Sequence, residues 1–255
     1  GSEEIESGLA NAICRAYNDW LADCCSGSNR MFGAGMSPPH EVERAVQEAR
    51  RAVNELGFKT VFMRPNQVHG RNWQDPYYDP LWAEIQRLKV PISFHEGGLV
   101  DLPQPGDNFG THMLYHTCTH SMSMMLAAVD MAGGGVLERF PGLTVALLEG
   151  NCSWAPWLIW RMDEGYEREG DIFMPDLTEL PSEYFKRQCW VSVEPDEVPA
   201  RYMIDALGSD RIVFSTGYPH GDSKYPYAVD SFFELPLSED EKRRILWDNC
   251  AEFYN

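Results

Sequence analysis

Short apolar runs alternate along this chain with longer stretches in which hydrophobic residues recur every three or four positions. Short apolar runs are typical of strands buried on both faces, and a spacing of three to four is typical of amphipathic helices. Regular alternation of the two predicts a parallel sheet wrapped by helices, an α/β fold. Six strands are predicted, at 30–36, 60–64, 90–94, 144–150, 189–194 and 211–217.

Helical spacing fills the intervals between these strands. Ser238 with Glu241 forms a capping box at the start of the last predicted helix. The segment 168–181 is expected to be irregular. With no linker, repeat or low-complexity tract, residues 1–255 are expected to form one domain. The helices are expected at 9–24, 38–56, around 81–88, at 121–131, 136–140, 154–166, 199–207 and 239–254.

Composition narrows the possible partners. A formal charge of −18 argues against nucleic acid and anionic membrane surfaces. No apolar run approaches the roughly 20 residues of a membrane span, and nothing at the start resembles a signal peptide. Seven cysteines without a CxxC pair are expected to be reduced, buried thiols of a cytoplasmic protein. Gly1-Ser2 resembles the remnant of an expression tag, and aromatic residues around Trp73 to Trp82, expected to be exposed, suggest self-association as a homo-oligomer.

The stretch Val90 to Gly98, VPISFHEGG, is central to the functional hypothesis. In an α/β barrel the chemistry lies at the carboxyl ends of the strands. His95-Glu96 would lie at that edge, and Gly97-Gly98 would allow a sharp turn and a close approach to a ligand. The long loop from Leu99 to Met113 suggests a lid or binding loop.

Other predicted strands also end in polar residues. These are Arg64 to Asn66, Glu149 to Asn151, Glu194 to Asp196 and Tyr218 to His220. An unpaired carboxylate is costly to bury, and a divalent metal held by imidazole and carboxylate groups would offset that cost at Glu149 and Glu194. The alternative is that each carboxylate caps a helix or pairs with an arginine.

A histidine-rich run, HMLYHTCTH, precedes the predicted helix at 121–131. His112, His116 and His120 are spaced by four, which places side chains on one face of a helix. Only His120 is expected to lie in regular helix, because Thr117 or Thr119 would cap a helix starting there.

Several motifs occur in an order that resembles the second amidohydrolase family, which includes the aminocarboxymuconate-semialdehyde decarboxylase-like enzymes. The resemblance runs from about Leu9 to the C-terminus and implies a distorted (β/α)8 TIM-type barrel with one or two divalent metals at its mouth. Its motifs are FHEGG, GGGVLERFPGLTVALLEGNCSWAPWLIWRMDE, CWVSVEPDE, GSDRIVFSTGYPHGDSKYP and ILWDNCAEFY.

The chain departs from the family pattern in three places. The family's first strand, with its HxH metal pair, and the next strand are expected to be missing before Glu3, in agreement with six strands rather than eight. Glu149 stands where decarboxylase-like members carry a histidine, a change that resembles one subgroup. Gly217 stands where the family has an aspartate that binds metal and acts as general base.

The resemblance implies that His95 is a metal ligand, Glu149 its probable companion and Glu194 a possible ligand or catalytic group. His120 is expected to be a further ligand or the general acid/base. Zinc is the expected metal, with iron or manganese as alternatives. Core packing is expected for Trp157. Substrate binding is predicted for Arg64, which would hold a carboxylate, and for Asn66, Phe109, His116, Trp154 and His220.

The leading hypothesis is a metal-dependent hydrolase that cleaves a C–N, ester or thioester bond of a small molecule by a metal-bound water. A second is non-oxidative decarboxylation of an aromatic or unsaturated acid. A third is a catalytically silent barrel with a binding role, supported by Gly217 and the absent HxH strand. Impaired hydrolysis is expected, unless Glu194 or His120 replaces the missing base.

Overall fold

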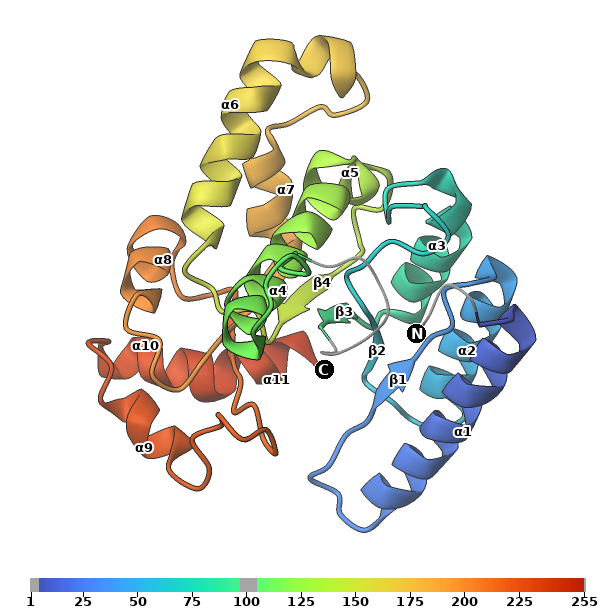
Figure 1. Ribbon diagram of the computed structural model, residues 1–255, viewed down its shortest axis with the longest axis horizontal. Coiled ribbons are helices and arrows are strands. Elements are labelled where there is room, and N and C mark those ends of the chain that lie inside the picture. The colour runs from blue at the N-terminus through green and yellow to red at the C-terminus, as the bar shows by residue number, and fades with distance from the viewer. Residues whose placement is uncertain (1–4, 97–104, 255) are drawn as a thin grey trace.

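A six-stranded parallel sheet forms the centre of the protein (Figure 1). The computed structural model describes residues 5–96 and 105–254. The strands follow one another in the sheet in chain order, and every neighbouring pair is parallel. Their bounds are β1 Ala34–Met36, β2 Thr60–Met63, β3 Ile92–His95, β4 Val145–Leu148, β5 Cys189–Val193 and β6 Ile212–Phe214.

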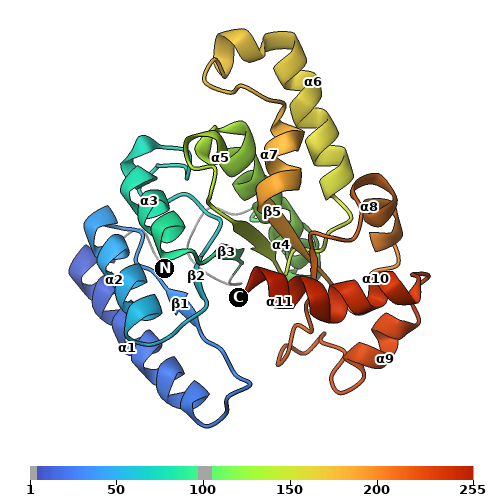
Figure 2. The same cartoon turned by 180° about the vertical axis from the view of Figure 1, so that it is seen from behind.

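Helices follow the strands and cover the outside of the sheet, as the two opposite views show (Figures 1 and 2). Strand pairing in the described residues runs from β1 to β6 without closing on itself. The distorted, open α/β barrel expected from the sequence is therefore confirmed. The α-helices are α1 Ser7–Ser26, α2 Val42–Asn54, α3 Asp79–Leu88, α4 His112–Ala128, α5 Val136–Arg139, α6 Ala155–Phe173, α7 Pro181–Gln188, α8 Ala200–Leu207, α9 Ala228–Phe233, α10 Glu239–Arg243 and α11 Asn249–Phe253.

All six predicted strands are present, but each is shorter than expected, and the first begins at Ala34 rather than Arg30. One turn of 3-10 helix, η1, spans Pro76–Tyr78, and π-helical turns span Val129–Gly133 (η2) and Arg244–Asp248 (η3). The last predicted helix is thus interrupted, although its capping box is confirmed. Gly97, Gly98 and residues 99–104 of the predicted lid loop, as well as Gly1-Ser2, lie outside the described residues.

Helix α6 is longer than predicted and includes the first part of the supposedly irregular segment, as far as Phe173. Gly170, which lowers helix propensity, is buried there. A Cβ on Gly170 would lie 2.3 Å from Cδ2 of Tyr166, so the ring occupies the space of a larger side chain. Helix α7, Pro181–Gln188, was not predicted.

Three of the four aromatic residues from Trp73 to Trp82 are buried and Tyr77 is half-buried, so the expectation that they form an exposed self-association surface was wrong. Trp73, Tyr78 and Trp82 are each at most 1% exposed. Their indole N–H groups are satisfied internally, because Trp73 donates to the Pro65 carbonyl at 2.8 Å and Trp82 donates to the Trp73 carbonyl at 3.2 Å. Tyrosine and tryptophan bury well when their polar atoms find such partners.

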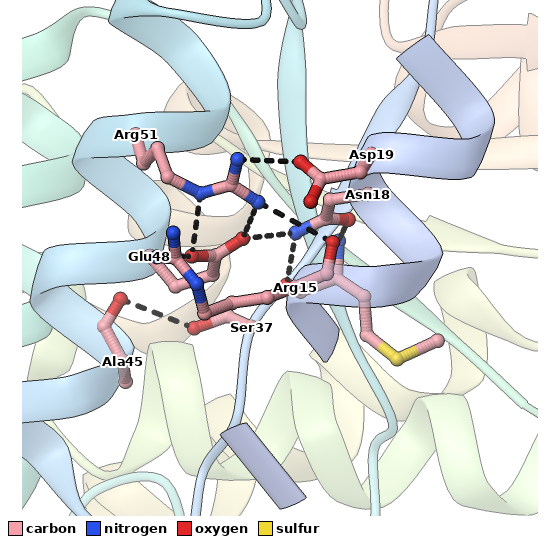
Figure 3. Close-up of polar contacts among 8 residues, drawn as sticks. Arg15, Asn18, Asp19, Ser37, Ala45, Glu48 and Arg51 are labelled. Atoms are coloured by element: carbon pink, nitrogen blue, oxygen red, sulfur yellow. Dashed lines mark hydrogen bonds and ion pairs between the residues drawn. The ribbon is translucent and has the colours of Figure 1, made fainter. Parts of the chain in front are cut away.

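Helix α1 covers the free edge of β1 through a buried side-chain amide (Figure 3). Asn18, fully buried, accepts from the Met36 N–H at 2.7 Å and donates to the Met36 carbonyl at 2.9 Å. The amide therefore satisfies both backbone groups that a neighbouring strand would otherwise pair. At Met36 the free edge of β1 is thus covered by this chain's own first helix.

A buried carboxylate holds this amide in place (Figure 3). Glu48 on α2, 1% exposed, accepts from the Asn18 amide at 2.7 Å. It also accepts from Nε and Nη2 of Arg51 at 2.9 and 2.7 Å and from Nη1 of Arg15 at 3.0 Å. Arg51 in turn donates to Asp19 at 2.6 Å. Glu48 on α2 is thus linked to Asn18 on α1, and Asn18 is linked to Met36 of β1. Both carboxylate oxygens of Glu48 have partners.

Cysteine placement agrees only in part with the expected buried thiols. Cys14, Cys152 and Cys189 are buried, whereas Cys24 is exposed and Cys250 is half-buried; all seven cysteines are free. In the described part of the chain, no helix has both the length and the apolar character required to cross a membrane.

Asp130, in the π-turn after α4, makes stability depend on pH. It accepts from the Trp73 N–H at 3.1 Å, but burial raises its pKa to about 6. A raised carboxyl pKa means that the unfolded chain releases this proton at lower pH than the folded protein. The folded protein therefore loses stability as pH rises from about 4 to about 6, and the loss is complete above that.

Asp130→Asn is expected to remove this penalty while keeping an oxygen acceptor for the Trp73 N–H. The free energy of unfolding of the variant, relative to the wild type, should increase by about 1 kcal/mol between pH 5 and pH 8 and then stay constant. Urea denaturation at several pH values measures the difference. A difference that does not change with pH would contradict it.

Candidate active site

The carboxyl ends of neighbouring strands bring the predicted polar residues together. His95 is the last residue of β3, Glu149 follows β4, Glu194 follows β5 and Gly217 follows β6. His95 Nε2 lies 2.9 Å from Glu149 Oε2. A Cβ on Gly217 would lie 3.9 Å from Glu194 Oε2 and 4.0 Å from Glu149 Oε1. The four positions therefore share one rim of the sheet, as predicted.

The backbone carbonyl of Glu96 fixes the tautomer of His95. It lies 2.7 Å from Nδ1 of His95, and a carbonyl oxygen can only accept, so Nδ1 carries the hydrogen. In a neutral imidazole, Nε2 would then direct a lone pair at the Glu149 carboxylate oxygen. Two acceptors at 2.9 Å require a positive charge or a proton between them.

The contact between His95 and Glu149 shifts the pKa of both groups. Although burial opposes the charged form of His95, its contact with Glu149 raises the His95 pKa. Burial also opposes ionisation of Glu149, but the neighbouring imidazoles, His95 first, lower the Glu149 pKa. Glu149 has φ of +56°, a left-handed conformation that is uncommon outside glycine and that is concentrated at functional sites.

His220 reaches the same carboxylate from the loop after β6. Its Nδ1 lies 2.9 Å from Glu149 Oε1, so Glu149 stands between two imidazoles. The sequence predicted a substrate-binding role for His220, and its contact with Glu149 places it beside the predicted metal ligands. The turn that carries it begins at Gly217, whose φ of +63° favours glycine, and the His220 N–H donates to the Gly217 carbonyl at 2.9 Å.

Glu194 is the second carboxylate of the cluster. Burial, followed by repulsion from Glu149 and Glu197, raises its pKa to about 7. Its Oε1 is buried and makes no hydrogen bond within the described residues. Glu194 therefore carries a proton for much of the time at neutral pH, which suits a proton donor.

Two cavities meet at this cluster. One of about 470 Å³ has largely apolar walls from α1, β1 and β2, including Ile13, Met36 and Phe62, and it ends at the imidazoles. The other, of about 400 Å³, is more polar and contains Glu149, Glu194 and Gly217. His120 and His220 line both. A small molecule with an apolar body and a polar end matches this arrangement.

Arg64 lies in the apolar cavity, as its predicted role requires, but it is already paired. Its Nη2 donates to Glu96 Oε1 and its Nε donates to Asn66 Oδ1 at 3.2 Å. Asn66 also lines this cavity, while Glu96 is 2% exposed. The guanidinium is thus held in a fixed orientation by two side chains.

All three histidines of the HMLYHTCTH run lie in α4, so the expectation that only His120 is helical was wrong. Neither threonine caps the helix. Thr117 and Thr119 instead donate their hydroxyls to the carbonyls of Met113 and Tyr115, four residues earlier, at 2.8 Å each. His116 lines the polar cavity, in agreement with its predicted place near a ligand.

Three aromatic residues are not where the sequence placed them. Trp154 does not line either cavity described above; it packs in the core against Phe185, and its indole donates to the Gly150 carbonyl at 2.8 Å. Phe109 is 46% exposed and also lines neither cavity. Trp157, expected in the core, is 57% exposed.

Glu197 supports the site, and sequence reasoning missed it. Its Oε1 accepts from the N–H groups of Cys152 and Ser153 at 2.9 and 3.0 Å, and its Oε2 accepts from the Glu194 N–H at 3.2 Å. It therefore ties the loop after Glu149 to the loop after β5. The available signal was its position three residues after Glu194, in the SVEPDE motif.

The donor set has the chemistry that a divalent cation requires. His95 offers an imidazole lone pair, and Glu149 Oε2 is a buried oxygen without a well-formed hydrogen bond in the described residues. As they are placed, however, no three His, Cys, Asp or Glu side chains of the described residues form a ready metal cage. The side chains of His95, Glu149 and His220 thus fit a divalent cation by the chemistry of their donor atoms, and the two imidazoles each lie 2.9 Å from the Glu149 carboxylate.

Comparison with known proteins identifies relatives along nearly the whole chain. A model of the amidohydrolase family matches residues 6–255. The 2-amino-3-carboxymuconate-6-semialdehyde decarboxylase of Dictyostelium discoideum is 29% identical over 94% of this chain, which spans 66% of that protein. The gamma-resorcylate decarboxylase of Polaromonas sp. (strain JS666) is 26% identical over 98% of this chain and 78% of its own length.

A solved structure from Polaromonas sp. JS666 has the same fold. It is a dihydroxybenzoic acid decarboxylase with bound manganese and the inhibitor 2-nitroresorcinol, with a TM-score of 0.80 and 24% identity. The match covers 98% of this chain and 77% of that one. These relatives are decarboxylases, so the leading hypothesis of a hydrolase was wrong. The expected divalent metal agrees with the manganese in that structure, whereas zinc is not confirmed.

Proposed function

Because the chain belongs to the amidohydrolase family, we propose that it catalyses the metal-dependent, non-oxidative decarboxylation of a small aromatic or unsaturated carboxylic acid. The observation that carries this proposal is the apolar cavity of about 470 Å³ that ends at an imidazole–carboxylate cluster. A planar hydrocarbon ring matches the walls, and its carboxylate matches the polar end. Relatives that span nearly the whole chain are decarboxylases of such acids.

The reaction replaces a C–C bond by a C–H bond, so one proton must reach the carbon that loses CO2. Glu194 supports this step, because its buried carboxyl group has a pKa of about 7. Arg64 would orient the substrate at the other end of the cluster, since its guanidinium is fixed by Glu96 and Asn66. Phe62 and Met36 would exclude water from the ring.

A divalent ion held by His95, Glu149 and His220 would supply positive charge that binds the substrate carboxylate. His95 would use Nε2, since its Nδ1 hydrogen is committed to the Glu96 carbonyl. Manganese, which the Polaromonas structure contains, is the resident metal we propose.

The test is a panel of 2,6-dihydroxybenzoate, 5-carboxyvanillate and benzoate, incubated with the purified protein and Mn²⁺, with CO2 and product measured. Release of CO2 from at least one hydroxylated acid is expected, together with its loss in His95→Ala. The His95→Ala variant should also bind less Mn²⁺ by elemental analysis, because it lacks one imidazole ligand.

The catalytically silent barrel is the remaining alternative and rests on Gly217. It predicts tight binding of an aromatic acid in the apolar cavity without any CO2 release. Calorimetric titration with 2-nitroresorcinol, alongside the activity panel, separates binding from turnover. Binding without turnover in the presence of Mn²⁺ would contradict the proposed decarboxylase.

A further inference from the structure

Three polar side chains connect the surface of the protein to the site. His116 and His120 lie one turn apart on α4, and Asp222 lies on the loop after β6. His116 Nε2 lies 3.0 Å from Asp222 Oδ2, and His116 Nδ1 lies 2.9 Å from His120 Nδ1. The two imidazole rings meet edge to face at 86°. Both ring nitrogens of His116 have a partner, Asp222 at Nε2 and His120 at Nδ1.

Hydrogen-bond chemistry fixes the direction of this chain. An ionised Asp222 carboxylate only accepts, so Nε2 of His116 carries a hydrogen. In a neutral imidazole the other nitrogen then has a lone pair, and Nδ1 of His116 accepts. Nδ1 of His120 must therefore donate, which leaves Nε2 of His120 without a hydrogen.

We propose that Asp222 and His116 are positioning residues that fix His120 in the tautomer whose Nε2 is an acceptor. His120 lines both cavities, so the lone pair is available to a ligand at their junction. Its catalytic use rests on the proposed function: His120 accepts a hydroxyl hydrogen of the substrate, and proton delivery to carbon is left to Glu194. The two groups then have opposite roles on the same site.

The exposure of the outer two residues makes the chain accessible to mutation. The side chains of His116 and Asp222 are 43% and 66% exposed, so neither supports the core. His112 offers a matched control, because its ring stacks on His116 at 5.7 Å and 5° but no hydrogen bond joins it to His120. His112→Ala removes an imidazole from the same helix face and leaves the chain from Asp222 to His120 intact.

The tautomer can be measured without substrate. In protein labelled with ¹⁵N-histidine, two-bond ¹H–¹⁵N spectra report which ring nitrogen carries hydrogen, and loss of signals in His120→Gln assigns them. We expect His120 to be protonated on Nδ1 in the wild type and in His112→Ala. In Asp222→Ala and His116→Phe, the Nε2-protonated form should increase, and Asp222→Glu should restore the wild-type pattern.

Kinetics test the consequence for turnover. With the acid that the panel selects, Asp222→Ala should lower kcat by about 10-fold or more at little-changed KM, and Asp222→Glu should recover most of it. Wild-type His120 protonated on Nε2, or a tautomer that is unchanged in both Asp222→Ala and His116→Phe, would overturn the proposal. An inactive protein with Nδ1-protonated His120 would refute the proposed function and still support the tautomer.

Discussion

Replacing Glu48 by alanine is expected to lower the free energy of unfolding by about 3–5 kcal/mol. The Glu48 side chain is 1% exposed and accepts hydrogen bonds from Asn18, Arg51 and Arg15 (Figure 3). Its removal leaves the Arg51 guanidinium, itself 10% exposed, with Asp19 as its remaining carboxylate partner. Removing Glu48 from its buried pair with Arg51 costs far more than the net contribution of that pair, because the buried guanidinium then has only the exposed Asp19 carboxylate to compensate its charge.

The loss should extend to the edge of the sheet. Without Glu48, the Asn18 amide loses the partner that orients it toward the backbone of Met36. Hydrogen exchange of the Met36 amide is therefore expected to accelerate in Glu48→Ala more than global unfolding alone requires. Protection of Met36 that changes only in step with global stability would show that Asn18 holds β1 without help from Glu48.

An exposed ion pair supplies the control. Glu183 on α7 lies 2.8 Å from Lys186, and their side chains are 52% and 45% exposed. Glu183→Ala is the same substitution in solvent and should cost less than about 1 kcal/mol. Urea denaturation of both variants measures the two values under identical conditions. Similar losses for Glu48→Ala and Glu183→Ala would contradict the role assigned to the buried network.

The sheet and the rim of the site could be predicted because both follow from local rules. The residues Ile92 to Phe94 are apolar or small because both faces of the strand are buried, and all three are at most 1% exposed. Parallel strands end at the same edge, so the residues after each strand meet. The proximity of His95, Glu149 and Glu194 required no further information than the order of the strands.

Contacts that depend on the path of a loop could not be predicted. Asp222 meets His116 across 106 positions of sequence, and it does so because the chain turns at Gly217 and again at His220. The burial of Trp73 was hidden for a similar reason, since the loop around it is polar and only the fold shows that its indole reaches Pro65. Such contacts depend on tertiary packing rather than on the period of hydrophobic residues.

The residues of the site alone could not distinguish hydrolysis from decarboxylation. Imidazole and carboxylate ligands suit a metal that activates water and equally suit one that holds a carboxylate. His95 and Glu149 are compatible with both reactions. The relatives overturn the hydrolase hypothesis, because those that match nearly the whole chain are decarboxylases, and they support the proposed decarboxylation.

Replacing Gly217 by aspartate is expected to convert the site into a stronger metal site. The Cβ has space, since its nearest neighbour is the Ser223 Cβ at 3.7 Å. The new carboxylate would join Glu149 and Glu194, so repulsion and the strain of φ at +63° should destabilise the metal-free variant. A bound cation reverses the repulsion, and the melting temperature should rise more on adding Mn²⁺ than in the wild type.

Gly217→Ala separates the effect of backbone strain on stability from the effect of the new carboxylate, because alanine brings the same left-handed strain without a ligand. It should lose stability by about 1 kcal/mol and show no added response to Mn²⁺. The proposed function assigns proton delivery to Glu194 and the accepting role to His120, so neither Gly217→Asp nor Gly217→Ala is expected to raise kcat by more than about 10-fold, well below the roughly 10²–10⁴ that an acid/base group is worth where no other performs its task. A kcat that rises about 100-fold or more in Gly217→Asp would mean that Glu194 does not perform the proton transfer. A Mn²⁺ response shared by the alanine variant would exclude residue 217 from the metal site.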